Sequence, residues 1–199
     1  MKWLTKSIVC GVCLISVSVL ASNGETANTV TPDSTDIEKG QHLFRTAGGY
    51  GCSTCHGLYA QGGGNAGGNI RGKGLEALNL ILEKEPTMVL LGPTLSADDR
   101  RRLSIYVTEL GKLNLIEWTI ENGVIHQNGN IVAHKSNQLV ILNKTFNFIE
   151  FNFPKVISQT TVTINPYETL AFQWHADDKP LDLKQPNYDV KMQTINELK

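Results

Sequence analysis

One short motif constrains this chain more than any other feature: Cys52-Ser53-Thr54-Cys55-His56. On one turn of a helix, residues i, i+3 and i+4 lie on the same side. Both cysteine sulfurs and the imidazole can therefore face one ligand. The spacing C-x-x-C-H is the attachment signature of a covalently bound c-type haem. We expect thioether bonds at Cys52 and Cys55, with His56 as the proximal axial ligand of the iron.

Other uses of a C-x-x-C pair fit this sequence less well. A thioredoxin-like redox pair accompanies a βαβ pattern, and no strand-like run precedes Cys52. A structural zinc site takes four ligands, and the only other cysteines, Cys10 and Cys13, lie in an N-terminal segment that we expect to be removed. For the same reason we expect no structural disulfide in the mature chain.

The N-terminal segment has the form of a secretory signal peptide. Lys2 and Lys6 supply a basic region, residues 7–20 are apolar, and Ala21 ends a small-residue cleavage site. We expect residues 1–21 to be a signal peptide, with export to the periplasm and no membrane span after cleavage. The alternative is an uncleaved anchor, for which the apolar run is short. Residues 22–35 are polar and unpatterned, which predicts a flexible leader.

Charge and length exclude some classes of function. The chain has 18 basic and 19 acidic residues and a net charge of −1, so nothing predicts binding to nucleic acid. Its 199 residues leave room for two small domains after removal of the signal peptide. We expect these domains at residues 36–113 and 114–199.

Helical patterns surround the motif. We expect a helix that Asp36 caps at its N-terminus, a second over residues 75–84 that ends before Pro86, and a third from Ser96 to Gly111. Residues 57–74 contain eight glycines. They form either a low-complexity linker or, as we prefer, a loop whose backbone packs against a flat porphyrin. Residues 100–102 are three arginines, which we expect on a solvated face; the alternative is a docking patch for an acidic partner.

The segment 36–113 resembles the class I c-type cytochromes. Gly40 and Phe44 match a glycine and an aromatic residue on that family's first helix, and Tyr106 matches an aromatic residue on the last helix, which crosses the first. Residues 67–72 are similar to the family's G-P-x-L-x-G loop, with Gly68 in place of the proline. A backbone carbonyl near that proline orients the proximal imidazole in the family, so this departure leaves the orientation of His56 open. The resemblance implies an all-α class I cytochrome c fold.

The expected distal axial ligand is Met88. It lies eight residues before Ser96, as the ligand methionine of the family lies before the last helix. The mature chain has one other methionine, Met192, in a polar stretch. Two alternatives stay open: Met88 fills a gap in the core, or His42 is the distal ligand.

Residues 114–199 have the pattern of a β protein. Asn122-Gly123 and Asn128-Gly129 predict turns, and short β-branched or aromatic runs recur between them and later prolines. The run resembles a cupredoxin, which implies an all-β sandwich. A type 1 copper site needs a cysteine and two histidines. No cysteine lies in this segment, and the family's first histidine is absent around Phe148, so we expect a cupredoxin-like domain without copper. Another metal could use His126, His134 and His175.

The expected function follows from the ligands. A haem with protein ligands at both axial positions favours electron transfer over catalysis. We expect a periplasmic electron carrier, not an enzyme, which holds one haem c and meets other periplasmic or membrane-bound redox proteins. One alternative is a ligand-binding or enzymatic haem module with a displaceable sixth ligand.

Another alternative is a docking subunit of a larger redox complex. In that case the second domain faces the partner. The candidate anchors are its large aromatic residues: Trp118, Phe148, Phe151 and Trp174. If the two domains are independent, removal of residues 114–199 leaves the haem environment unchanged.

Overall fold

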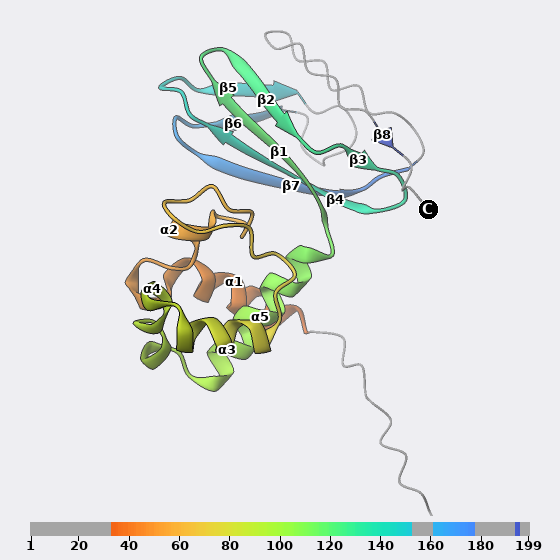
Figure 1. Ribbon diagram of the computed structural model, residues 1–199. Coiled ribbons are helices and arrows are strands. Elements are labelled where there is room, and N and C mark those ends of the chain that lie inside the picture. Colours follow the sequence, from red (N-terminus) through yellow and green to blue (C-terminus); the bar gives the residue numbers. More distant parts are fainter. Residues whose placement is uncertain (1–32, 153–160, 178–193, 196–199) are drawn as a thin grey trace, which may run out of the picture. The chain divides into compact units, whose positions relative to one another are not determined.

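The computed structural model describes residues 33–152, 161–177 and 194–195 (Figure 1). From Pro32 onward the chain forms one compact unit. The predicted signal peptide, residues 1–21, and residues 22–32 of the predicted leader lie outside the described residues. Within the described residues, no helix is long and apolar enough to cross a membrane.

The first part of the unit is helix-rich. Its elements, in order, are α1 (Ser34–Thr46), η1 (Ala47–Gly49), α2 (Ser53–His56), α3 (Leu75–Lys84), α4 (Pro86–Val89), η2 (Gly92–Thr94) and α5 (Ala97–Gly111). The expectation that Asp36 caps the first helix is wrong, because the Asp33 carboxylate accepts a hydrogen bond from the Thr35 N–H instead. Ser96 caps α5 as expected and forms a capping box with Asp99.

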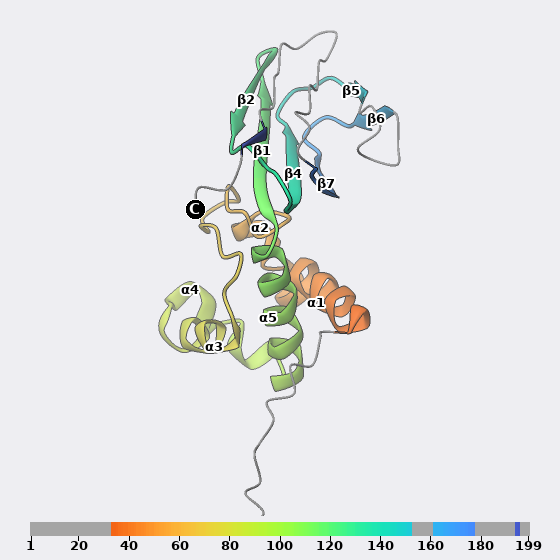
Figure 2. The same ribbon diagram turned by 90° about the vertical axis from the view of Figure 1, so that its right-hand side faces the viewer.

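Helices α1 and α5 pack closely across each other (Figure 2). Gly40 permits this approach, since a β-carbon there would collide with the backbone carbonyl of Arg102. Four residues on, the rings of Phe44 and Tyr106 lie 5.5 Å apart between centroids. Arg101 and Arg102 both pair with Asp36, at 2.8 and 3.2 Å. Two of the three consecutive arginines are thus tied to an acidic side chain of this protein, which weakens the docking-patch alternative.

The second part is strand-rich. Its strands are β1 (Asn114–Glu121), β2 (Val124–Asn128), β3 (Ile131–Val132), β4 (Ser136–Asn143), β5 (Ile149–Asn152), β6 (Thr161–Ile164), β7 (Thr169–His175) and β8 (Thr194–Ile195). Four strands form one sheet in the order β2-β1-β4-β7. In this sheet β1 and β4 are parallel, and the other neighbouring pairs are antiparallel. Strands β5 and β6 pair separately, as do β3 and β8.

The predicted turn at Asn122-Gly123 is confirmed. The two residues join β1 to β2 and have φ angles of 52° and 76°. Positive φ at both central positions is the requirement of a type I′ turn, which asparagine and glycine meet most readily.

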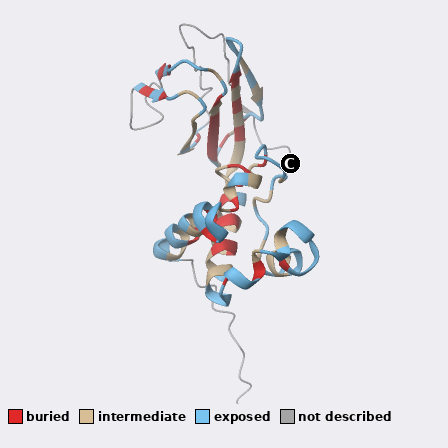
Figure 3. Ribbon diagram, turned by 90° about the vertical axis from the view of Figure 1, so that its left-hand side faces the viewer, coloured by how far each residue is buried: buried red, intermediate tan, exposed pale blue. Residues whose placement is uncertain are grey.

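Each part has its own group of buried side chains, and Figure 3 shows them along the strands and within the helices. In the strand-rich part the core includes Trp118 and Phe151, whose rings lie 5.7 Å apart. In the helix-rich part it includes Phe44, Leu103 and Tyr106. Burial of this kind is the main favourable contribution to folding.

The prediction of an all-α class I cytochrome c fold followed by an all-β cupredoxin-like sandwich is wrong. The described residues hold five short α-helices and a mixed four-stranded sheet within one compact unit. Two physical reasons account for the error. Hydrophobic period marks where strands lie but not which strands pair, so the parallel β1–β4 pair could not be foreseen. The expected loop over residues 57–74 does not by itself show how the helices and strands around it pack. The predicted boundary between 113 and 114 falls between α5 and β1, and the division into separate domains stays a prediction.

Candidate functional site

Helix α2 carries the motif. The His56 N–H donates to the Cys52 carbonyl at 2.9 Å, and the Cys55 N–H donates to the same carbonyl at 3.2 Å. The three motif residues therefore have the i, i+3 and i+4 spacing of one helical turn, which puts side chains on one side of a helix. Both thiols are free; Cys52 is buried, whereas Cys55 and His56 are half-buried.

The glycine-rich loop, residues 57–74, packs its backbone against α2. The last carbonyls of α2 need partners outside the helix, and the loop supplies them. Gly62, Asn65 and Gly67 donate their N–H groups to the carbonyls of His56, Thr54 and Cys55, at 2.7, 3.0 and 2.8 Å. The loop is therefore a defined part of the site and not a linker.

Gly67 illustrates why the loop needs glycines. A β-carbon at this position would lie 2.5 Å from Nδ1 of His56 and 2.8 Å from the Cys55 carbonyl oxygen. Real β-carbon contacts are longer than this, so a side chain here would displace the imidazole or the loop. The absence of side chains lets the main chain lie directly against the ring.

The loop also orients the imidazole. Nδ1 of His56 lies 2.9 Å from the carbonyl oxygen of Gly68. A carbonyl can only accept, so Nδ1 carries the proton in this hydrogen bond. In the neutral ring Nε2 then has the free lone pair that a metal ligand needs. Gly68 replaces the proline of the similar loop in class I c-type cytochromes, but its carbonyl still orients the imidazole.

Burial raises the pKa of the Cys52 thiol to about 11. The neutral thiol is therefore the dominant form at pH 7. A dithiol redox pair of the thioredoxin type depends on an exposed cysteine with a lowered pKa. Cys52 has the opposite character, which weakens the redox-pair alternative.

Met88 lies on α4, is half-buried and packs against the hydrophobic cluster that contains Cys52. The structure thus brings the expected distal ligand to the same cluster as the attachment site. Met192, the other methionine, lies outside the described residues.

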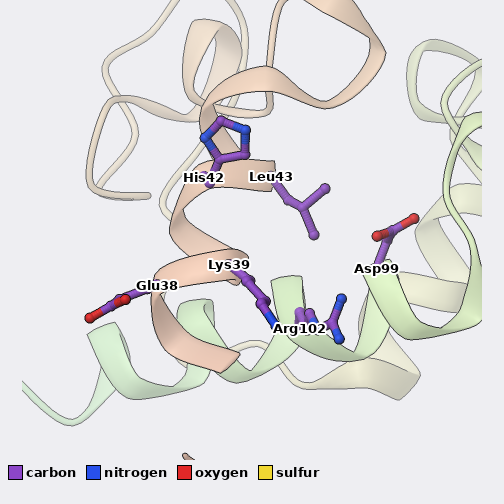
Figure 4. Close-up of a pocket in the computed structure, with 6 residues that line it drawn as sticks. All are labelled: Glu38, Lys39, His42, Leu43, Asp99 and Arg102. Carbon is purple, nitrogen blue, oxygen red and sulfur yellow. The ribbon is translucent and has the colours of Figure 1, made fainter. Parts of the chain in front are cut away.

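His42 is exposed on α1, as expected for a residue that is not a ligand. It borders a shallow depression of about 360 Å³ (Figure 4). The lining residues come from α1 and α5: Glu38, Lys39, His42, Leu43, Asp99 and Arg102. None of the expected haem ligands lines this depression.

The histidines of the strand-rich part do not gather. His126 lies on β2, His175 ends β7, and His134 lies in the turn before β4 with a φ of 57°. Among the residues with a described placement, no three His, Cys, Asp or Glu side chains are grouped so that they could hold a metal ion.

The four aromatic residues considered as anchors for a partner differ in how far they are exposed. Trp118 and Phe151 are buried in the core and are not available to a partner. Phe148 is 69% exposed and Trp174 is half-buried.

Arg71 is a further residue of the site, and its role was not predicted from the sequence. Its guanidinium donates to the carbonyl oxygens of Tyr59, Leu110 and Leu113, at 3.2, 2.6 and 3.3 Å, and to Oε1 of Gln138. The one feature of the sequence that could have pointed to Arg71 is its charge, because the loop around it consists largely of glycines and small polar residues. Nothing in the sequence indicated which carbonyls it would reach, because those lie far along the chain.

No protein-family profile, no curated protein and no solved structure matches this chain.

Proposed function

We propose that this protein is an electron carrier that holds one covalently attached haem. The observation that supports the proposal best is the His56–Gly68 hydrogen bond, because it leaves Nε2 of His56 free while the two neighbouring cysteines remain unpaired. Two free thiols and one metal-competent imidazole on a single helical turn form the donor set that haem c requires.

Each residue has a distinct role in this proposal. Cys52 and Cys55 would hold the porphyrin through thioethers, and His56 and Met88 would bind the iron. When bound, the haem supplies a reversible one-electron couple. The chain's own contribution is to hold the axial ligands, to keep the proton on Nδ1 of His56, and to exclude water from the buried Cys52 side.

The proposal includes a location and a class of partner. The expected signal peptide sends the chain to the periplasm, where haem attachment to C-x-x-C-H motifs takes place. Its partners are other periplasmic or membrane-bound redox proteins, met through small and transient interfaces. With both axial positions filled by protein, no enzymatic role is proposed.

One observation favours a second candidate, a haem module with a displaceable sixth ligand. Helix α4 has only four residues, and Leu90, directly after it, is 78% exposed. A short helix with few buried side chains opens at low free-energy cost. Binding of carbon monoxide by the reduced protein separates the two candidates, because a firmly ligated Met88 excludes the gas.

Haem staining of a denaturing gel tests the proposal. The wild-type protein, expressed with a periplasmic haem-attachment system, should keep its haem after denaturation. Cys55→Ser should lower the haem signal sharply, since one thioether then holds the group alone. His42→Ala is the matched control, because it removes an exposed imidazole outside the motif, and it should stain like the wild type. A wild-type protein without stain would refute covalent attachment.

A further inference from the structure

The outer face of the four-stranded sheet is covered at two residues of β4, Gln138 and Val140. Side chains alternate between faces along a strand, and Leu139 and Ile141 of β4 belong to the buried core of the strand-rich part. Gln138 and Val140 therefore point to the opposite face, yet they are 0% and 2% exposed. Something other than that core buries them.

Residues of the glycine-rich loop reach this outer face. Arg71 donates to Oε1 of Gln138 at 2.5 Å. Burial raises the pKa of the Tyr59 hydroxyl, and the backbone of Ala171 on β7 is among the groups that act on it. Ala171 is opposite Val140 in the β4–β7 register, so it lies on the same face.

Arg71 is a half-buried cation, and all of its hydrogen-bond acceptors are neutral groups. Burial lowers its pKa, but a guanidinium remains charged at every physiological pH. A charge that is partly removed from water is destabilised when it loses a hydrogen-bond partner. Its acceptors are Gln138 and the three carbonyls of Tyr59, Leu110 and Leu113. Loss of the Gln138 acceptor would leave this charge incompletely compensated, so the segment around Arg71 would shift toward water.

That segment also carries the carbonyl that orients His56. Gly68 precedes Arg71 by three residues, and its oxygen lies 2.9 Å from Nδ1 of His56. Between them the chain is stiffened by a bond from the Arg71 N–H to Oδ1 of Asn69 at 2.9 Å and from the Ile70 N–H to the Ala60 carbonyl at 3.0 Å. Movement of Arg71 is therefore transmitted to Gly68.

We propose that Gln138, through Arg71, is a positioning residue for the imidazole of His56, so that the sheet takes part in setting the electronic character of the axial ligand. The proposal rests on the proposed haem function. A firm Nδ1–H···O=C bond makes Nε2 a stronger donor and stabilises the oxidised iron. A looser bond raises the midpoint potential.

Gln138→Leu is the decisive variant, because it removes the acceptor but keeps the volume of the side chain and the charge of Arg71. Two readouts are combined: amide hydrogen exchange of Gly67 and Ile70 in the reduced protein, and the midpoint potential. A hydrogen bond to a charged group supports an exchange increase of about tenfold. The midpoint potential should rise.

Two control variants show whether the effect of Gln138→Leu comes from the lost acceptor or from altered packing. Val140→Ala removes volume from the same strand and the same face but takes no hydrogen-bond acceptor from Arg71, so it should change neither readout. Gln138→Glu restores an oxygen acceptor for Arg71, so loop exchange should return to the wild-type rate. If Gln138→Leu and Val140→Ala give the same exchange rates and potential, Gln138 is only a packing residue and the inference is wrong.

The haem-staining experiment separates the two possible failures. A wild-type protein without covalent haem overturns the proposed function and this inference with it. A wild-type protein with haem ligated by His56, in which Gln138→Leu leaves the potential and the loop exchange unchanged, overturns the inference alone.

Discussion

Gly67 and Gly68 are neighbours in the loop against His56, but a methyl group would meet different surroundings at the two positions. At Gly67 it would collide with the imidazole, whereas at Gly68 no atom lies within 4 Å. Gly67→Ala should therefore lower the stability by about 2 kcal/mol, the usual cost of overpacking, which corresponds to roughly 4–8 °C in Tm for a chain of this size. Thermal unfolding of both variants checks this, with Gly68→Ala as the control. Equal Tm values for the two variants would contradict the close contact.

Cys52 offers a second test, in protein prepared without haem. Burial raises the pKa of its thiol to about 11 from the ordinary value of 9.0. The folded state then holds the proton more tightly than the unfolded state. Its contribution to stability is complete below pH 9 and is lost as the pH rises toward 11.

Alkylation of Cys52 should be slow at pH 7 and should accelerate up to about pH 11, as followed by mass spectrometry. Rapid labelling of Cys52 at pH 7 would show that the thiol is not buried.

Helix α4 is the element on which the proposed distal ligand depends. Its four residues begin with Pro86, and Met88 is the one side chain of α4 that packs against the buried cluster of the helix-rich part. A thioether ligand favours reduced iron. Met88→Ala should therefore keep the haem attached but lower the midpoint potential by roughly 0.1–0.3 V, within the span of about 0.8 V that axial ligands control.

Val89→Ala is the matched control for this variant. It shortens the adjacent side chain of the same helix, which is 39% exposed. A redox titration of both variants should show a shift for Met88→Ala alone. A parent-like potential in Met88→Ala would exclude Met88 as the ligand.

Local chemistry explains which elements the sequence predicted well. The Ser96 cap and the Asn122-Gly123 turn each depend on residues that are close together in sequence. The start of α1 was placed too late because two aspartates, Asp33 and Asp36, are both suitable caps, and only the structure shows which carboxylate meets a free N–H.

Contacts between distant segments explain what could not be predicted for the whole molecule. The motif Cys52–His56 identified the candidate site, but the partner of Nδ1 had to be found in the structure, because a carbonyl is present at every residue. Arg71 lies 67 residues before Gln138, and no local pattern connects the two. The sequence alone therefore predicts that residues 114–199 are independent of the site. The Arg71–Gln138 bond indicates that these residues support it.

The visible absorption spectrum of the purified protein tests electron transfer through a His56/Met88-ligated haem most directly. It should be recorded in the oxidised and reduced forms, with carbon monoxide added to the reduced form. We expect a reversible one-electron spectral change, a weak band at the red edge of the oxidised spectrum that reports the bond between Met88 and iron, and no change with carbon monoxide. A protein without haem absorption, or one that lacks the red band and binds carbon monoxide, would contradict this function.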